Sequence, residues 1–150
     1  MIYIKPLLKL LNINLVFSFK NTIKNILIKN SPTSESNIIY KIPCHNCSNI
    51  YIGQTSKSLS TRINQHKYNV RRLDNNSALF KHAFDNSHSI NWDGSNKIIA
   101  CNDFQKRNIM ESALIQLSWD SNINLTPGLF KFDPIIIKYM KLELNKLLDM

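Results

Sequence analysis

Residues 38–66 read IIYKIPCHNCSNIYIGQTSKSLSTRINQH, and this stretch decides the fold. Two short runs rich in isoleucine and tyrosine, Ile38–Ile42 and Ile50–Ile52, flank the turn-forming segment Pro43–Asn49. Such runs favour β-strands, and a turn-rich segment between them predicts a β-hairpin.

A helix is expected directly after the hairpin. We expect Gly53 to end the second strand and Thr55 or Ser56 to cap the helix, because hydroxyl side chains accept bonds from free N–H groups. Three apolar residues then recur at helical spacing: Leu59, Ile63 and Val70.

His66 lies within this apolar stripe and Arg62 on its edge, at about 100° per residue. Both side chains should therefore point back toward the hairpin, where Tyr40 and Tyr51 lie. Taken by themselves, a strand tyrosine or a histidine on an apolar stripe is usually a packing residue. Their convergence with an arginine predicts a site.

The motifs in this stretch resemble those of the GIY-YIG nuclease domain. Tyr51-Ile52-Gly53 matches the second motif, and Ile38-Ile39-Tyr40 matches the first, except that Ile38 stands in place of glycine. Arg62 and His66 match the arginine and histidine of the helix that follows. The Cys44-x-x-Cys47 insertion between the motifs is similar to the endonuclease domain of Penelope-like retroelements.

The resemblance covers residues 37–135 and implies an α/β (α+β) fold, with a small three-stranded antiparallel sheet flanked by helices. It implies an endonuclease that hydrolyses phosphodiester bonds of double-stranded DNA with Mg²⁺ or Mn²⁺ and nicks target DNA for retroelement insertion. A reverse transcriptase domain of the parent element is then a partner, and the nucleus, ahead of the mitochondrion, is the expected location.

The resemblance also implies a set of catalytic residues: Tyr40, Tyr51, Arg62, His66, Glu111 and Asn124. Tyr40 would act as the base or orient the water, and Arg62 would grip the phosphate, since its planar fork suits phosphate geometry. His66 would shuttle a proton or contact the phosphate. Asn124 matches a late asparagine of the family, although by its sequence context it is an ordinary turn residue.

Glu111 is the strongest candidate carboxylate. We expect a helix from a cap at Asp103 to about Trp119, in which Phe104 and Ile115 lie on the same side as Glu111. A carboxylate within an apolar arc is costly unless it is paired or binds a metal. The residues leave open an ion pair, perhaps with Arg62, whereas the resemblance implies Mg²⁺, which needs few protein ligands.

A second constellation has metal-ligand chemistry: Cys44, Cys47, His82 and His88. Cys-x-x-Cys at a hairpin tip is half of a zinc knuckle, and thiolates with imidazoles suit Zn²⁺. The cysteine pair and the histidine pair are far apart in sequence, and His45 could replace one of the two histidines. The resemblance implies that all four residues, Cys44, Cys47, His82 and His88, bind the ion. We see no hydrophobic cluster shared by the hairpin tip and residues 82–88, so zinc is expected to be a structural staple there.

The composition is typical of a globular, basic, intracellular protein. Its 150 residues are 43% hydrophobic, with a net charge of +9 and a pI of about 9.6. This surplus favours a polyanionic partner such as nucleic acid. Four cations on the exposed flank of the helix are the candidate DNA contacts, although such a flank is often only solvated: Lys57, Lys67, Arg71 and Arg72. Three cysteines and no secretory signal argue against a disulfide framework.

The chain divides into four parts. Residues 1–30 form an apolar, basic extension, residues 31–36 a linker, residues 37–135 the nuclease-like domain and residues 136–150 a C-terminal helix that starts near Pro134. Lysine and asparagine interrupt the extension, so a membrane span is not expected. Before the linker we expect two helices, Leu7–Leu11 and Thr22–Ile28, and an extended piece, Asn14–Phe19. Within the domain we also expect a helix, Ala78–His88, and a strand, Lys97–Cys101.

Two rival interpretations stay open. If the backbone at residue 38 needs a positive φ, the Cβ of Ile38 distorts the site and the chain is a catalytically inactive DNA-binding remnant. Alternatively, the chain is a zinc-stabilised adaptor that binds protein or RNA through its basic faces. Retention of all the catalytic residue types argues against both.

Overall fold

The computed structural model describes residues 35–148, with side chains described as far as residue 142. The elements in chain order are β1 (Ile38–Pro43), β2 (Ile50–Thr55), α3 (Leu59–Arg71), α4 (Ala78–Asn86), β3 (Asn96–Ala100), α5 (Phe104–Leu117), a short 3₁₀ turn (Trp119–Ser121) and α6 (Pro134–Leu148). The elements predicted at Leu7–Leu11, Asn14–Phe19 and Thr22–Ile28 lie outside the described residues.

The three strands form one antiparallel sheet in the order β2-β1-β3, which confirms the predicted α+β fold. Tyr40 on the central strand pairs with Gly53 on β2. On its other side the register of β1 with β3 shifts between Ile39 and Tyr40. A bulge of this kind redirects side chains and is frequent beside functional sites.

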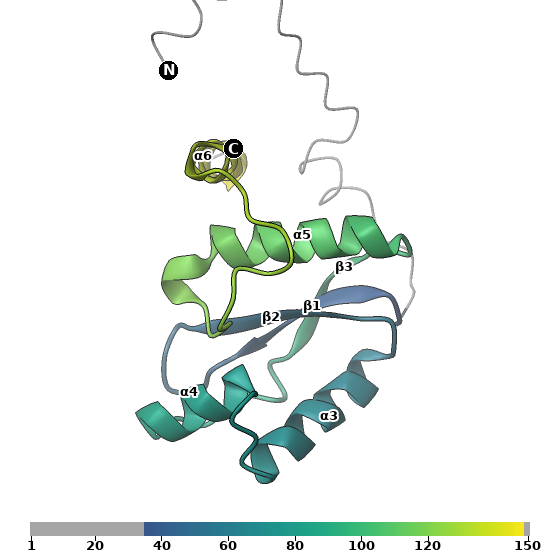
Figure 1. The fold of residues 1–150 in the computed structure, drawn as a ribbon, viewed down its shortest axis with the longest axis vertical. Helices are drawn as coiled ribbons and strands as arrows, with labels where there is room; N and C mark the ends of the chain where they lie inside the picture. The colour runs from purple at the N-terminus through teal and green to yellow at the C-terminus, as the bar shows by residue number, and fades with distance from the viewer. Residues whose placement is uncertain (1–34, 149–150) are drawn as a thin grey trace, which may run out of the picture.

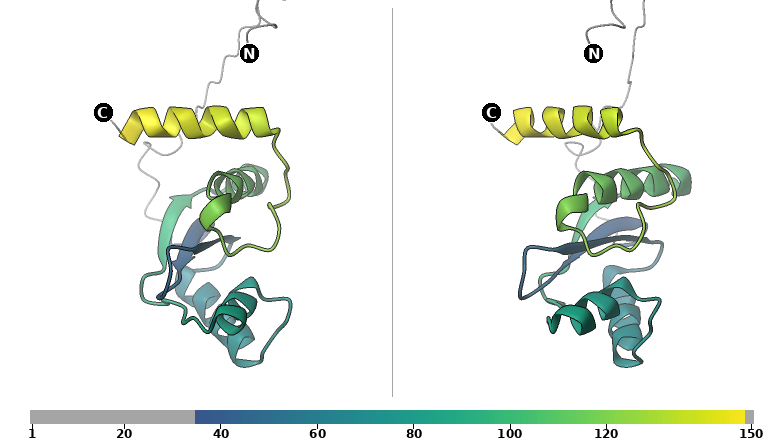
Figure 2. Two further views of the ribbon diagram at one scale, coloured as in Figure 1. Left: turned by 90° about the vertical axis from the view of Figure 1, so that its left-hand side faces the viewer. Right: turned by 60° about the vertical axis from the view of Figure 1, so that its left-hand side comes forward.

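Helices cover both faces of the sheet (Figure 1). Helices α3 and α4 pack on one face, where the main core forms around alternate residues of β1 that include Ile38, Tyr40 and Ile42. Helix α5 covers the opposite face through a smaller cluster with Ile39 and Ile52. Figure 2 shows α6 outside α5, away from the sheet.

Two local predictions at the start of α3 were wrong. Strand β2 does not end at Gly53 but continues to Thr55. Neither Thr55 nor Ser56 caps the helix, because the Thr55 hydroxyl accepts a bond from the Lys57 N–H within the turn. Ser58 is the N-cap, and its hydroxyl accepts the N–H of Thr61.

The later elements agree closely with expectation. Asp103 caps α5, and α6 begins at Pro134. Helix α4 ends two residues earlier than predicted, because Ser87 adopts a left-handed conformation with φ of 54°. The N–H of His88 then bonds the carbonyl of Ala83, which turns the chain back over the helix.

Ile38 needs no unusual backbone conformation. The non-glycine residues of the described chain with positive φ are Asn37, Leu73 and Ser87, so Ile38 lies in ordinary strand geometry. Its side chain is only 1% exposed and belongs to the main core. The backbone strain considered for a β-branched residue at this position is therefore not found.

Candidate active site and metal centre

Tyr40, Arg62 and His66 form one hydrogen-bonded group. The Tyr40 hydroxyl lies 2.7 Å from His66 Nε2, and Arg62 Nε donates to the same hydroxyl over 3.1 Å. Because Arg62 can only donate, the Tyr40 hydroxyl has its own proton free for His66. Tyr51 adds its ring edge-on to His66, with centroids 5.1 Å apart.

Gly53 makes this grouping possible. A Cβ atom built on Gly53 would lie 2.6 Å from Tyr40 Oη and 2.9 Å from a ring carbon of Tyr51. Those distances are too short for a side chain, and neither ring can move far in the packed core. Position 53 therefore requires glycine for space, and not for a turn.

Burial sets the protonation states of this group. Burial raises the pKa of Tyr40, with a smaller contribution from Tyr51, and the Arg62 charge offsets only part of the rise. Burial and, to a smaller extent, the Arg62 charge lower the pKa of His66 to about 4. At neutral pH the group therefore contains a protonated phenol, an uncharged imidazole that can accept its proton, and a guanidinium cation.

Glu111 approaches the same group from α5, which covers the other face of the sheet. Its carboxylate acts on the pKa values of both Tyr40 and Tyr51. Burial raises the pKa of Glu111, while a bond from the Gln54 N–H and the charges of Arg62 and Arg107 oppose that rise. Since β2 is an edge strand, this corner of the sheet is the place where residues from its two faces meet.

The predicted surroundings of Glu111 were partly wrong. Phe104 is 61% exposed, so it does not form an apolar arc around the carboxylate. Ile115 is buried as predicted, with Ala113, but the buried residues of α5 also include Arg107, Asn108 and Ser112. Among the described side chains the ion pairs are Lys106–Asp103 and Lys141–Asp120, so the alternative of a direct Glu111–Arg62 pair within 4.0 Å is not found.

Asn124 lies on the outer edge of β2. Its Nδ2 donates to the carbonyl of Ile52 over 2.8 Å, and its Oδ1 accepts the Ile52 N–H over 2.9 Å. The side chain thus substitutes for a neighbouring strand and fixes the main chain between Tyr51 and Gly53. This geometry gives Asn124 a positioning role next to the tyrosine group.

The sequence analysis missed Arg107, which is only 3% exposed. Its guanidinium donates to neutral acceptors: Gln54 Oε1 at 2.7 Å, the Cys101 carbonyl at 2.7 Å and Asn37 Oδ1 at 3.3 Å. The Gln54 amide in turn donates to Asn108 Oδ1. A buried cation without a carboxylate partner raises the positive potential at Glu111. In the sequence, an arginine within a helix looks like any solvated charge, so no pattern pointed to it.

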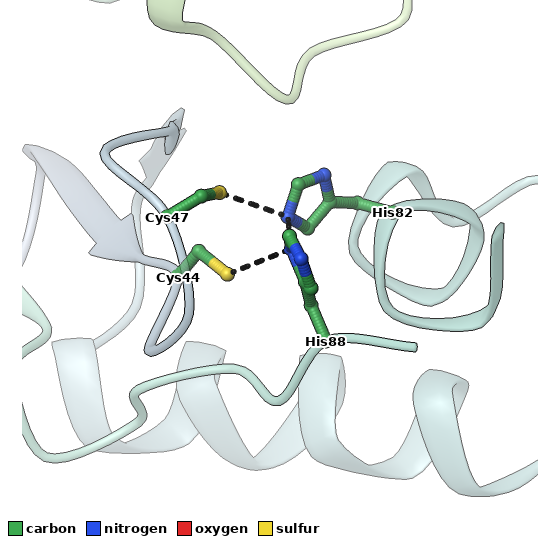
Figure 3. A group of neighbouring side chains, drawn as sticks. All are labelled: Cys44, Cys47, His82 and His88. Atoms are coloured by element: carbon green, nitrogen blue, oxygen red, sulfur yellow. Dashed lines mark hydrogen bonds between the residues drawn. The ribbon is translucent and has the colours of Figure 1, made fainter. Parts of the chain in front are cut away.

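The cysteines and histidines of the second constellation come together as predicted (Figure 3). The ligand atoms of Cys44, Cys47, His82 and His88 all lie within 4.8 Å of one another. Cys44 Sγ is 3.6 Å from His88 Nδ1, Cys47 Sγ is 3.6 Å from His82 Nε2, and the two nitrogens are 3.3 Å apart. These four residues could hold a metal ion. His45 is exposed and Cys101 bonds the Asp103 carbonyl, so neither is part of the group.

The hairpin tip is shaped for sulfur ligands. The Asn46 N–H donates to Cys44 Sγ over 3.4 Å. Burial raises the pKa of the Cys47 thiol, and the Asn49 N–H opposes this rise because it favours the thiolate. Asn46 Oδ1 also accepts the N–H of Ser89, and this bond ties the tip to the segment that carries His88. Bonds of this type orient ligands around a metal.

One expectation about this centre was wrong. Cys44 and Leu79 of α4 belong to the same buried core, and Cys47 and Ala83 pack against it. The hairpin tip and α4 therefore share a hydrophobic cluster, and an ion here would add to that contact and not replace it.

The candidate DNA contacts lie along α3 and the turn before it. Lys57, Arg71 and Arg72 are exposed, and Lys67 is half-buried. Arg72 also donates to the Tyr68 hydroxyl over 2.7 Å. These cations are on the protein surface, whereas Arg62 points inward to the tyrosines.

No protein-family model, curated protein or solved structure matches this chain. Among residues 35–148, no helix combines the length and the hydropathy that a membrane crossing needs. The geometry therefore defines the class by itself: an α+β domain with a polar tyrosine–arginine–histidine–glutamate corner and a separate two-cysteine, two-histidine group.

We expect the stability of the domain to fall between pH 6.5 and 4 because of His66. Its folded pKa of about 4 is below the ordinary value of 6.5, so the unfolded chain binds the proton first as the pH falls. The loss should be on the order of 3 kcal/mol at the acid end. NMR titration of the histidine ring protons measures this pKa directly; a His66 titration near 6.5 would contradict the burial argument.

Proposed function

We propose that this chain is a divalent-metal-dependent endonuclease of the GIY-YIG type, similar to those of Penelope-like retroelements. The observation that supports this most is the meeting of Tyr40, Arg62, His66 and Glu111 at one corner of the sheet. Phosphodiester hydrolysis needs a proton acceptor for water, a cation for the phosphate and a carboxylate for a metal. This corner offers all three.

The hydrogen bonds suggest the route of the proton. Tyr40 is 0% exposed, so substrate binding must first admit the attacking water to its hydroxyl. Tyr40 then accepts a proton from that water while its own hydroxyl proton passes to His66 Nε2, so no free phenolate is needed. This relay fits the raised pKa of Tyr40 and the uncharged state of His66 at neutral pH. The imidazolium that results is buried, which favours return of its proton through Tyr40, to which its Nε2 is bonded, after the water has attacked.

Arg62 is suited to bind the scissile phosphate. One edge of its guanidinium bonds Tyr40 through Nε, and Nη1 bonds Gln65. These two bonds fix the plane of the fork and leave further N–H groups for phosphate oxygens. Tyr51 packs against His66 and keeps the imidazole in line with Tyr40.

Glu111 fits a Mg²⁺ or Mn²⁺ ligand. It is a half-buried carboxylate with no ion-pair partner within the described side chains, and hard cations that keep most of their waters need only one or two carboxylates. When bound, such an ion would stabilise the charge that develops on the phosphate. The Gln54 N–H and the charges of Arg62 and Arg107 favour the ionised carboxylate that such an ion would need.

We propose Zn²⁺ as the ion of the Cys44, Cys47, His82 and His88 group. Zinc bonds of about 2.3 Å to sulfur and 2.0–2.1 Å to nitrogen, in a tetrahedron, predict S···N edges near 3.6 Å and an N···N edge near 3.3 Å. The measured separations are 3.6, 3.6 and 3.3 Å. Four protein ligands close the site to water, so the ion is structural and is not the catalytic metal.

Double-stranded DNA is the proposed substrate, in keeping with the net charge of +9 and the exposed cations on α3. Nicking of target DNA in the nucleus, alongside a reverse transcriptase of the parent element, follows from the resemblance. An inactive DNA-binding remnant is the alternative, and the ordinary backbone at Ile38 removes the main argument for it.

Purified protein should nick supercoiled plasmid with Mg²⁺ and not with a chelator, and Glu111→Gln should abolish the nicking while DNA binding persists. The amide keeps the shape of the side chain but loses the charge that holds a metal. Asp120→Asn, which neutralises an exposed carboxylate, is the matched control and should cut normally. Equal cutting by Glu111→Gln and the wild type would rule out the metal-ligand role.

Arg62→Lys should reduce the nicking rate by roughly 10²–10³-fold, the usual cost of losing one transition-state contact. Lysine keeps the charge but cannot bond Tyr40 and the phosphate with a planar fork. Arg71→Lys makes the same change on the exposed flank and should alter the rate little. If Arg62→Lys cuts within twofold of the wild type, Arg62 does not belong to the site.

Cys47→Ser should lower zinc content and melting temperature together, because the ion binds the folded state. Elemental analysis should give one zinc per wild-type chain, and Cys101→Ser is the control with an unaltered metal group. Nicking per folded molecule should persist and still need Mg²⁺. A folded Cys47→Ser protein that no longer cuts would instead put the zinc in the active site.

A further inference from the structure

A cleft of about 560 Å³ lies on the other flank of α3, and the mechanism above does not use it. It is bounded by the first turns of α3, the loop before β3 and the start of β3. Its polar and aromatic lining includes Ser58, Ser60, Asn64, Lys67, Trp92 and Lys97, together with Glu35 and Ser95. Its volume is within the range of small-ligand sites, about 300–1,000 Å³.

Helix α3 separates this cleft from the tyrosine group. Arg62 and His66 contact Tyr40, whereas Ser60, Asn64 and Lys67 line the cleft. Asn64 lies about 200° around the helix axis from Arg62, so the two sets occupy opposite flanks. A ligand in the cleft would thus lie next to the proposed cleavage site without covering it.

The cleft combines an aromatic ring with positive charge. Trp92 is half-buried and packs against the main core, which holds its ring in place. The Lys67 ammonium lies 5.9 Å from the centre of that ring. Lys97 adds a second cation, and Glu35 at the rim offsets one of the two.

Two further features favour an anionic group. The first turn of α3 contains no acidic residue, so apart from the bond of Thr61 N–H to the Ser58 hydroxyl, no side-chain charge offsets the partial positive charge of its free N–H groups. The hydroxyl oxygen of Ser95, which also lines the cleft, is buried and has no hydrogen-bond partner among the described residues. Buried polar atoms are normally paired, and a ligand would supply the missing partner if the Ser95 side chain turned toward the cleft.

We propose that this cleft binds one unpaired nucleotide of a single-stranded nucleic acid, with its base on Trp92 and its phosphate between Lys67, Lys97 and the start of α3. A stacking base takes the place of the Lys67 ammonium over the ring and frees that flexible cation for the phosphate. A paired base has both faces covered by its neighbours, so an unpaired base is the one that can stack here. The inference rests on the proposed nucleic-acid function.

The test uses Trp119→Phe, which leaves Trp92 as the only one of the two tryptophans. With Mg²⁺ and Mn²⁺ left out to prevent cutting and the zinc left in place, a four-nucleotide oligothymidylate should quench Trp92 fluorescence in a saturable way. Adding Ser60→Glu should weaken this binding roughly fivefold or more, because it places a negative charge against the phosphate. The same change should not lower the melting temperature, since an acid in the first turn of a helix is stabilising.

Gln105→Glu is the matched control. Gln105 is exposed and is the second residue of α5, as Ser60 is of α3, so the charge change and the helix position are the same. It should leave oligothymidylate binding unchanged. Equal weakening by both variants would mean that net charge, and not the cleft, governs binding, and would overturn the proposal.

The other outcomes separate this inference from the proposed function. If the protein nicks plasmid but oligothymidylate leaves Trp92 unchanged, the cleft proposal alone fails. If a short duplex quenches as strongly, or inorganic phosphate displaces the oligonucleotide at equal concentration, the cleft does not select an unpaired nucleotide. If neither single strands nor plasmid bind, the proposed DNA partner fails as well.

Discussion

The buried hydroxyl of Tyr40 is the constraint on which the rest of the structure depends. Tyr40 is 0% exposed, so its hydroxyl must find partners inside the protein or cost roughly 1–3 kcal/mol. His66 and Arg62 are those partners, and they fix the rotation of α3 about its axis. Gly53 supplies the space, which in turn fixes the register of β2 against β1.

The sequence predicted the elements that depend on local pattern. The alternation of β1, the i, i+4 pair of Arg62 and His66 and the cap at Asp103 follow from side-chain period and capping chemistry. The bonds of Arg107 could not be predicted, because Gln54 and Asn37 meet it only after the sheet and α5 pack. The shift of the α3 cap to Ser58 has a similar cause, since Thr55 already bonds Lys57 within the turn.

The metal centre and the tyrosine group are two ends of one strand face. Side chains alternate along a strand, so Tyr40 and Cys44 project from the same face of β1 and its extension, about 13 Å apart at 3.3 Å per residue. Ile42 lies between them in the core. An ion at Cys44 would therefore stiffen the strand that carries Tyr40 without contacting the tyrosine group, so the proposed structural site would support the proposed catalytic one at a distance.

The ionisation of Glu111 depends on its burial and on the positive charges around it. Burial favours its neutral form, whereas the Gln54 N–H, Arg62 and Arg107 favour the carboxylate. A divalent cation would add to the second set, because a positive charge near an acid stabilises the ionised form. Arg107 contributes in advance, as a buried cation that bonds only neutral oxygens. The fixed positive charge of Arg107 thus favours the ionised form of Glu111 that the proposed metal would need, while Arg107 and Glu111 form no ion pair within 4.0 Å.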